Sequence, residues 1–223
     1  MQMKILVILL CTISNTCVSQ DTDETLKKLE DSLKNKSVSV SEVLSSEVYM
    51  QLHSKTMFRN LIKKYAPIGQ ITIVTDFEPG KKIRVKCKVI TENNKPFSNG
   101  LVYVYQTSAK GWYSDTAAHI LIREGDMRHA RLFGYVYTDE NGECKIETVQ
   151  PSGYPMSDLP AHIHISISKD GENMRGVPGE LLFDDDERLT SERRKRAQQE
   201  GFLISKDTGI KSSPLYYYLI RLN

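Results

Sequence analysis

The hydrophobic pattern changes its period near residue 66, and this change divides the chain into two parts. From Thr25 to Tyr65, apolar residues recur every three or four positions without an intervening Pro or Gly, which is typical of helices. From Ala66 onward, short alternating runs are separated by turn residues, as in β-strands. We therefore expect an N-terminal helical segment over residues 20–65 and a β-sandwich domain over residues 66–223.

The fold class predicted is mainly β: a β-sandwich core with short N-terminal helices and a charged helix near the C-terminus. Turn pairs such as Asn99-Gly100 and Asn141-Gly142 punctuate the runs. The charged helix is expected over Leu189–Gly201. The strands are expected at Ile71–Val74, Ile83–Ile90, Leu101–Gln106, Phe133–Thr138, Cys144–Val149, Ala161–Ser168 and Leu215–Leu222.

Residues 1–19 have the pattern of a secretory signal peptide. Lys4 supplies the positive start, Ile5–Leu10 the apolar run, and Cys17 and Ser19 the small residues before a cleavage point. The apolar run is too short to span a bilayer, and no later stretch is long enough. The sequence thus predicts a secreted, extracellular protein that makes no membrane contact once the signal is removed.

Charge and cysteine content agree with this prediction. Without residues 1–19 the chain has 29 basic and 28 acidic residues, and its one basic run, Arg193–Arg196, follows the acidic run Asp184–Glu187. This balance predicts a solvated helix and no nucleic-acid partner. Cys87 and Cys144 both lie in predicted strands and could form a disulfide in an oxidising compartment, or stay apart as buried thiols.

Two histidines, His162 and His164, carry the strongest chemical signal. Side chains two positions apart on a strand project from the same face, so the two imidazoles point together while Ile163 and Ile165 face the other way. Neutral imidazole is the commonest metal ligand among side chains. A half-exposed strand can also carry two outward histidines for solubility alone, so the pair by itself leaves both interpretations open.

Two tyrosines follow strand ends, where a scaffold can present functional groups. Tyr154 lies in the Pro- and Gly-containing loop Pro151–Pro155, eight residues before His162. Tyr113 lies just beyond the strand Leu101–Gln106. Taken alone, Tyr113 could equally be an aromatic packed on the rim of the sandwich with its hydroxyl in water.

These four residues lie in blocks whose wording and order resemble the intradiol ring-cleavage dioxygenases, the catechol- and protocatechuate-type non-haem iron(III) enzymes, over about half the chain. Secreted eukaryotic members of this family exist. The matching blocks are Val104-Tyr105-Gln106 leading to Gly111-Trp112-Tyr113, then Gly134 and Thr138 to Gly142, then Thr148 to Pro155, and then Pro160-Ala161-His162-Ile163-His164.

The resemblance implies one non-haem Fe(3+) ion held by Tyr113, Tyr154, His162 and His164. It further implies that Tyr154 and His164 are the axial ligands and that Tyr113 and His162 are equatorial. Tyr154 and Tyr113 are implied to be catalytic, and Tyr154 is the ligand that dissociates from the ion when the substrate binds. Tyrosinate is a hard anionic donor, so two of them favour ferric over ferrous iron. The implied substrates are small aromatic catechols and O2, and the implied products are cis,cis-muconic-type diacids.

Two positions depart from the family pattern. Leu159 stands where the familiar bacterial enzymes carry an arginine, and Glu180 stands where a glutamine is usual. Both changes disfavour negative charge near the substrate. Which arginine could supply the missing cation stays open among Arg123, Arg128, Arg131 and Arg175, with Arg131 the one to follow. Pocket size is expected to depend on Val102, Val104, Ser114, Asp115 and Leu159.

The leading hypothesis is therefore a secreted intradiol dioxygenase, expected as a monomer rather than a homodimer. The alternative is a non-catalytic β-sandwich that binds catechols or iron in the same pocket, motivated by Leu159 and Glu180. A metal-free interaction sandwich of the transthyretin-like kind is the third reading that the composition allows.

Overall fold

The computed structural model describes residues 23–114, 130–210, 212 and 214–223. The predicted signal peptide lies outside the described residues. Contacts divide the chain into two compact units, one ending at Ser39 and the other spanning Val40–Asn223. The first unit holds a helix over residues 23–34, and all other elements belong to the second. No helix among the described residues is long and apolar enough to cross a bilayer.

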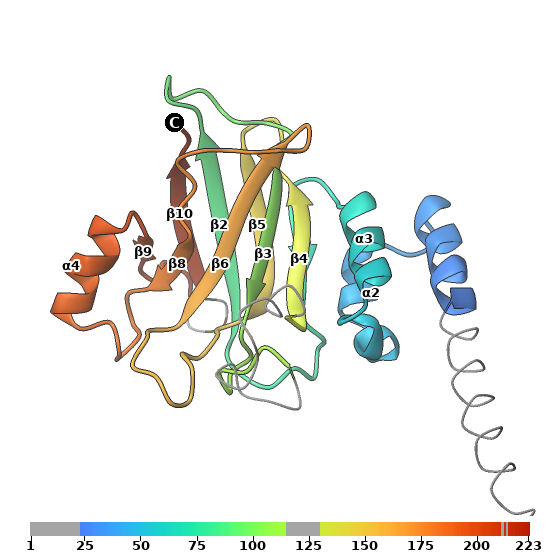
Figure 1. Cartoon of the computed structure of the whole chain (residues 1–223), viewed down its shortest axis with the longest axis horizontal. Coiled ribbons are helices and arrows are strands. Elements are labelled where there is room, and N and C mark those ends of the chain that lie inside the picture. The colour runs from blue at the N-terminus through green and yellow to red at the C-terminus, as the bar shows by residue number, and fades with distance from the viewer. Residues whose placement is uncertain (1–22, 115–129, 211, 213) are drawn as a thin grey trace, which may run out of the picture. The chain divides into compact units, whose positions relative to one another are not determined.

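Three short helices open the second unit: α2 (Val40–Leu44), the 3-10 helix η1 (Glu47–Leu52) and α3 (Thr56–Lys64). The Ser46 side chain caps η1 by accepting a hydrogen bond from the Val48 N–H. In α3, Phe58 and Ile62 lie four positions apart and are fully buried, so one apolar stripe packs inward. These helices lie beside β1 and β4 (Figure 1), so the unit boundary at Ser39 lies earlier than the change of sequence period.

Two sheets form the sandwich, and the prediction of a mainly β fold is confirmed. One sheet has the order β1-β5-β2-β10, and the other has the order β4-β3-β6-β8-β9 with β7 paired to β6 (Figure 1). The first contains β1 (Gln70–Thr72), β2 (Lys82–Ile90), β5 (Glu143–Val149) and β10 (Leu215–Arg221). The second contains β3 (Leu101–Gln106), β4 (Leu132–Tyr137), β6 (His162–Lys169), β7 (Glu172–Asn173), β8 (Glu180–Phe183) and β9 (Leu203–Ser205).

Alternation along the strands of the second sheet separates its two faces. Val104 pairs with Ile165, and both side chains are buried on the face opposite to Tyr105 and His164, which pair at the next position. The apolar face completes the core between the sheets, so the other face is left for the polar and aromatic side chains. The two histidines of β6 therefore project from the outer face of this sheet.

The charged helix α4 (Ser191–Gln199) covers part of that outer face. Thr190 caps it through a hydrogen bond from the Arg193 N–H, and Ala197 is its one buried residue. Ala197 packs with Leu182 of β8 and with Leu189, against which Phe202 and Ile204 also lie. The helix was expected from its charge pattern, whereas β8 and β9, the two strands beside it, were not.

Cys87 and Cys144 lie directly opposite each other in the antiparallel pair β2–β5. Both are completely buried, and in the structure both are free thiols. The hydrogen bond with Cys87 and burial raise the pKa of the Cys144 thiol, so Cys144 is unreactive as a thiolate. Disulfide formation on export stays a prediction.

Candidate metal centre

The Tyr113 phenol is positioned by a tight loop that follows β3. The Gly111 N–H donates to the Ser108 carbonyl over 2.9 Å, and Gly111 adopts φ +77°, a left-handed conformation that side chains rarely adopt. A Cβ atom at Gly111 would lie 2.3 Å from the Gly153 carbonyl oxygen. The loops that carry Tyr113 and Tyr154 therefore approach each other as closely as glycine permits.

The Tyr154 loop is fastened from both sides. The Ser152 N–H donates to the Ser108 carbonyl over 3.1 Å, and the Thr107 hydroxyl donates to the Ser152 carbonyl over 2.7 Å. From the other side, the Arg188 guanidinium donates to the Tyr154 carbonyl over 3.3 Å. These bonds hold an irregular segment in place without a regular ladder, and they aim the phenol inward.

The two imidazoles come from the first residues of the strand β6, on one face, as the strand pattern predicts. His162 uses Nδ1 to contact the Pro160 carbonyl at 2.8 Å, which fixes the proton on that nitrogen and leaves the Nε2 lone pair for a ligand. His164 stacks on the Tyr105 ring with centroids 4.5 Å apart and planes at 16°. Both rings are thus held in orientation by groups outside the site.

Four donor atoms meet in a closed ring, which we call the four-donor cluster. Tyr113 Oη lies 2.9 Å from Tyr154 Oη and 2.8 Å from His164 Nε2. His162 Nε2 lies 3.0 Å from Tyr154 Oη and 3.2 Å from His164 Nε2. Metal bonds of about 2.0–2.2 Å to nitrogen and oxygen put neighbouring ligand atoms about 3 Å apart. The spacing of the cluster therefore fits a single metal ion.

The protonation of the phenols also points to a cation. Burial raises the pKa of Tyr113 well above its ordinary value, and the adjacent Tyr154 raises it further. Burial raises the pKa of Tyr154 to about 12, an effect that the hydrogen bond with Tyr113 partly offsets. Both phenols therefore keep their protons at neutral pH in the metal-free protein, and a bound cation must release them.

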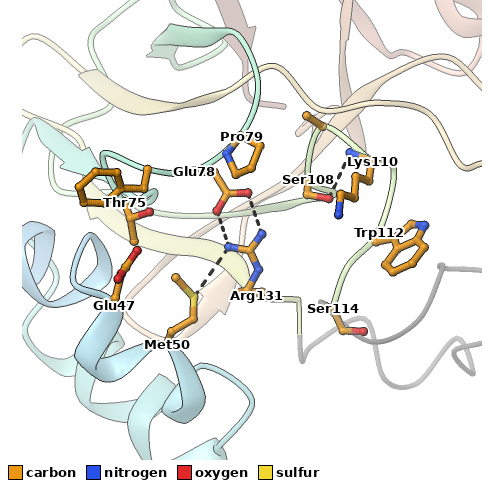
Figure 2. Close-up of a pocket in the computed structure, with 12 residues that line it drawn as sticks. Glu47, Met50, Thr75, Glu78, Pro79, Ser108, Lys110, Trp112, Ser114 and Arg131 are labelled. Atoms are coloured by element: carbon orange, nitrogen blue, oxygen red, sulfur yellow. Dashed lines mark hydrogen bonds and ion pairs between the residues drawn. The ribbon is translucent and has the colours of Figure 1, made fainter.

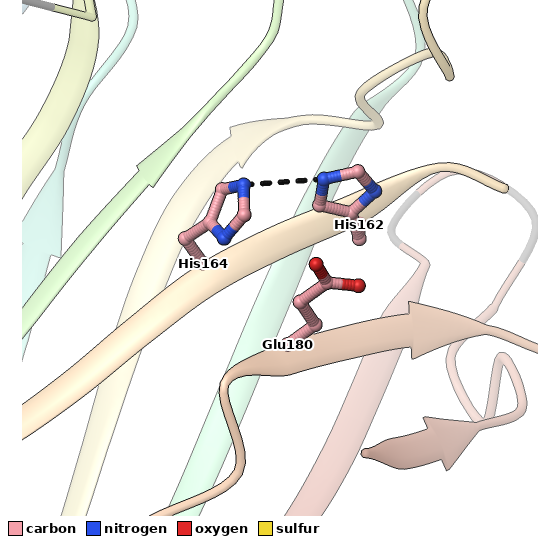
Figure 3. A group of neighbouring side chains, drawn as sticks. All are labelled: His162, His164 and Glu180. Carbon is pink, nitrogen blue, oxygen red and sulfur yellow. Dashed lines mark hydrogen bonds between the residues drawn. The ribbon is translucent and has the colours of Figure 1, made fainter. Parts of the chain in front are cut away.

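Glu180 lies beside this cluster, although it is distant from the histidines in sequence. It opens β8 and pairs directly with His164 of β6. One carboxylate oxygen of Glu180 and one ring nitrogen of each histidine lie within 4.8 Å of one another. Figure 3 shows the three side chains grouped on the neighbouring strands. The negative charge of Glu180 also raises the pKa of Tyr105, Tyr113 and Tyr154.

A pocket of about 230 Å³ adjoins the cluster through Glu180. Its walls include Leu159, Pro160, Leu182 and Phe202, together with the charged residues Arg193, Arg196 and Glu200 of the α4 region. The two positions at which the sequence departs from the family pattern, Leu159 and Glu180, thus line one pocket next to the donors. Leu159 is 51% exposed.

The structure places Arg131 away from this pocket. Its guanidinium binds the Glu78 carboxylate through two hydrogen bonds of 2.6 and 2.7 Å, inside a separate pocket of about 320 Å³ (Figure 2). Trp112 and Ser114 line that pocket, whereas the residues of the four-donor cluster are not among its described lining. The Arg131 charge is therefore matched by Glu78 rather than directed to the donors.

Val102 also lies elsewhere than its predicted role requires. It pairs with Val136 and Ile167, is fully buried, and projects from the sheet face opposite to Tyr105. Val104 shares that face because strand side chains alternate. Both fill the core between the sheets instead of lining a pocket beside the donors. Asp115, Arg123 and Arg128 lie outside the described residues.

Sequence reasoning did not find the groups that position the donors. The Asp186 carboxylate accepts the Ala161 N–H over 2.9 Å and the Arg188 N–H over 2.7 Å, so one side chain links the start of β6 to the loop that holds Tyr154. Asp186 lies in an acidic run that reads as solvated surface. No local signal distinguishes it, because its partners come together only in the folded chain.

Together, the sandwich and the cluster define a class: a β-sandwich whose outer sheet face presents two phenols and two imidazoles at the spacing of metal ligands. The family model described as "Dioxygenase" (Dioxygenase_C) matches residues 63–218. The chain belongs to this family, the intradiol ring-cleavage dioxygenases.

Individual relatives agree with this assignment. The chain is 28% identical over 141 residues to the protocatechuate 3,4-dioxygenase beta chain of Burkholderia cepacia, a match that covers 56% of this chain and 52% of the relative. It is 28% identical over 99 residues to the catechol 1,2-dioxygenase of Acinetobacter baylyi, covering 37% of this chain and 30% of that enzyme. The chain therefore spans about half the length, or less, of the curated relatives it matches.

Solved structures show the same fold. An intradiol ring-cleavage dioxygenase from Tetranychus urticae superposes with a TM-score of 0.53 at 21% identity, over 70% of this chain and 87% of that one. Catechol 1,2-dioxygenase from Pseudomonas arvilla C-1 gives a TM-score of 0.52 at 20% identity, over 70% of this chain and 57% of that one.

Proposed function

We propose that this protein is an iron(III)-dependent intradiol dioxygenase that acts on small catechols. In the reaction, the bond between the two hydroxyl-bearing carbons breaks, and both atoms of O2 enter the product as parts of its two carboxyl groups. The observation that supports this proposal most directly is the four-donor cluster, in which two phenols and two imidazoles close a ring with edges of 2.8–3.2 Å.

The donor set fits ferric iron in particular. Phenolate oxygens are hard, anionic ligands that match a trivalent ion better than a soft divalent one, and the two imidazoles complete the set without adding charge. Tyr113, Tyr154, His162 and His164 would hold the ion. When bound, ferric iron withdraws electron density from a catechol that binds to it and thereby makes a ring carbon reactive toward O2.

The protein must also take up the protons that a catechol releases. Tyr154 is suited to this role, because its pKa of about 12 in the metal-free protein makes its phenolate a strong base whenever it leaves the ion. The backbone of its loop is held separately, through the carbonyls of Ser152 and Tyr154. Movement of the phenol would therefore break its contacts with Tyr113 and His162 without releasing the loop.

The pocket beside Glu180 supports a small substrate. Its volume of about 230 Å³ lies below the range of about 300–1,000 Å³ that is usual for drug-sized ligands, so one aromatic ring with a short substituent suits it. The substrate would lie against Leu159 and Pro160, which are apolar. Export from the cell is part of the proposal and rests on residues 1–19 of the sequence.

Oxygen uptake tests the proposed activity. Iron-loaded protein is mixed with catechol, its alkyl and chloro derivatives and dihydroxybenzoates, and we expect one O2 consumed per catechol, with both atoms of labelled oxygen found in a muconic-type diacid. Absence of uptake with every one of these substrates, in protein shown to carry iron, would refute the catalytic proposal. Secretion is tested separately by comparing the chain with and without residues 1–19 in a eukaryotic culture medium.

A second candidate function is binding without turnover. Leu159 supplies no charge to steady an anionic substrate, and Glu180 adds a negative charge beside the donors. Both features disfavour the anionic intermediates of turnover but leave the four donors in place, which suits a protein that binds iron or a catechol without cleaving the ring. A coloured stoichiometric complex with catechol in air, without any ring-cleaved product, would favour this function over the first.

A further inference from the structure

The Glu180 carboxylate is close enough to the four-donor cluster to join it. β8 pairs with β6 so that Glu180 and His164 lie directly opposite on the same outer face of the sheet. One Glu180 oxygen and one nitrogen from each histidine fall within 4.8 Å of one another (Figure 3). Ligands on opposite sides of an ion with bonds of about 2.1 Å are about 4.2 Å apart. A small rotation of the flexible glutamate side chain therefore brings it into range.

Arg193 and Arg196 line the same pocket as Glu180, but they pair with Asp158 and Glu200 instead. Among the residues that the structure describes, the half-buried carboxylate of Glu180 makes no hydrogen bond and no ion pair. It raises the pKa of three nearby phenols, Tyr105, Tyr113 and Tyr154, which shows that it faces the aromatic groups of the site. A cation bound in the cluster would give this carboxylate a charged partner within reach.

We propose that Glu180 is a fifth protein ligand of the metal ion, so that the centre consists of two tyrosinates, two histidines and one glutamate. This inference rests on the proposed ferric site. Two phenolates and one carboxylate together balance the 3+ charge without a hydroxide ion. A catechol that binds through both oxygens must then displace Glu180 as well as a tyrosinate. An amide at position 180 would be a neutral, weaker donor, so the carboxylate holds ferric iron more tightly and admits catechols less readily than Glu180→Gln would.

The test compares ferric affinity among matched variants. Affinity is measured by competition with a chelator for wild-type protein, Glu180→Gln, Glu180→Asp and the control Glu200→Gln. Glu200 lines the same pocket but pairs with Arg196, so its replacement removes an equal charge without touching the cluster. We expect about 10- to 100-fold weaker ferric binding for Glu180→Gln and an unchanged value for Glu200→Gln.

Glu180→Asp separates a ligand from a nearby charge. Aspartate keeps the negative charge but is shorter by one methylene, so it cannot reach the ion from β8. We expect its ferric affinity to fall like that of Glu180→Gln, with the tyrosinate-to-iron absorption band shifted to longer wavelength in both variants because one anionic donor is lost. Wild-type affinity and colour in Glu180→Asp would overturn the proposal.

Two further outcomes distinguish this inference from the proposed function. Wild-type protein that binds ferric iron with the same affinity as Glu180→Gln would refute the fifth ligand and leave the ferric site intact. Wild-type protein that binds no ferric iron would overturn both. Under nitrogen, iron-saturated Glu180→Gln should also bind catechol about tenfold more tightly than wild type, since no carboxylate competes for the position.

Discussion

Two glutamates flank the loop that carries Tyr113, and they have opposite surroundings. Glu78 is 7% exposed and receives two hydrogen bonds from Arg131, in the pocket that Trp112 and Ser114 line. Glu180 is half-buried next to two imidazoles and has no ion-pair partner among the described residues. Arg131 pairs with the buried Glu78, whereas the half-buried Glu180 has no ion pair among the described residues, in agreement with the proposal that a bound cation pairs with Glu180.

The comparison also separates two roles of the polar groups around the Tyr113 loop. The Glu78–Arg131 pair links the segment before β2 to the start of β4, and so contributes to holding the sandwich together. The four-donor cluster instead gathers neutral side chains that contact one another at 2.8–3.2 Å, and burial raises the pKa of both phenols so that they keep their protons in the absence of a cation. Stability and metal affinity should therefore respond to different substitutions.

Breaking the Glu78–Arg131 ion pair should have the largest effect on the free energy of unfolding. Arg131→Met leaves the Glu78 carboxylate buried and unpaired, so we expect the free energy of unfolding of the metal-free protein to fall by about 3–5 kcal/mol. Glu180→Gln removes no partner and should change it by less than about 0.5 kcal/mol. Urea denaturation followed by circular dichroism measures both. Equal losses of stability in the two variants would show that Glu78 and Glu180 do not differ in their need for a partner within the chain.

The double variant Glu78→Gln with Arg131→Met provides the control for that experiment. Removing both charges leaves no unpaired carboxylate, so much of the lost stability should return. A double variant as unstable as Arg131→Met alone would assign the loss to packing of the arginine stem instead of to charge.

Removing a donor should lower the ferric affinity and leave the stability of the metal-free protein nearly unchanged. Tyr113→Phe deletes one phenolate from the cluster, and we expect ferric affinity to fall about 100-fold with loss of part of the visible absorption, while the metal-free protein keeps its fold. Tyr217 is an exposed residue of β10, so Tyr217→Phe is the control with the same chemical change. Unchanged colour and iron content in Tyr113→Phe would mean that this tyrosine is not a ligand.

Much of this organisation could be predicted from the sequence, for a physical reason. Alternation places His162 and His164 on one strand face whatever the partners are, and the strands β2, β3 and β5 follow from apolar runs bounded by turns. Tyr113 and Tyr154 required the family resemblance, because loops have no period from which a side-chain direction follows. The structure brings all four together, as the resemblance implied.

Other features depend on strand register and could not be read from the chain. Val102 was expected near the substrate, yet pairing with Val136 and Ile167 places it in the core. The short strand β8 has too few residues to show alternation, so the juxtaposition of Glu180 and His164 was hidden. The capture of Arg131 by Glu78, 53 positions away, is likewise a long-range event.

A positioning residue should give a smaller loss than a ligand. Arg188 donates to the Tyr154 carbonyl, and its backbone N–H is held by Asp186. Arg188→Met should loosen the Tyr154 loop and weaken ferric binding about tenfold, without altering the charge-transfer energy, because the ligand set is unchanged. Arg196→Met, which breaks an exposed pair with Glu200, is the matched control. A shift in band energy for Arg188→Met would indicate that it touches the donors directly.

The smallest expected effect is a loss of stability of the metal-free protein at alkaline pH. Burial raises the pKa of Tyr154 from 10.0 to about 12, so the folded chain holds this proton more tightly than the unfolded chain does. The associated stability is fully present below pH 10 and is lost as the pH rises toward 12. The metal-free wild type should therefore lose about 1 kcal/mol more than Tyr154→Phe between pH 9 and pH 11, as measured by urea denaturation. With ferric iron bound, the phenol is already ionised, so this difference between wild type and variant should vanish. If the difference persists in the iron-loaded protein, Tyr154 keeps its proton there. Tyr154 would then not be an ionised ligand of the metal ion.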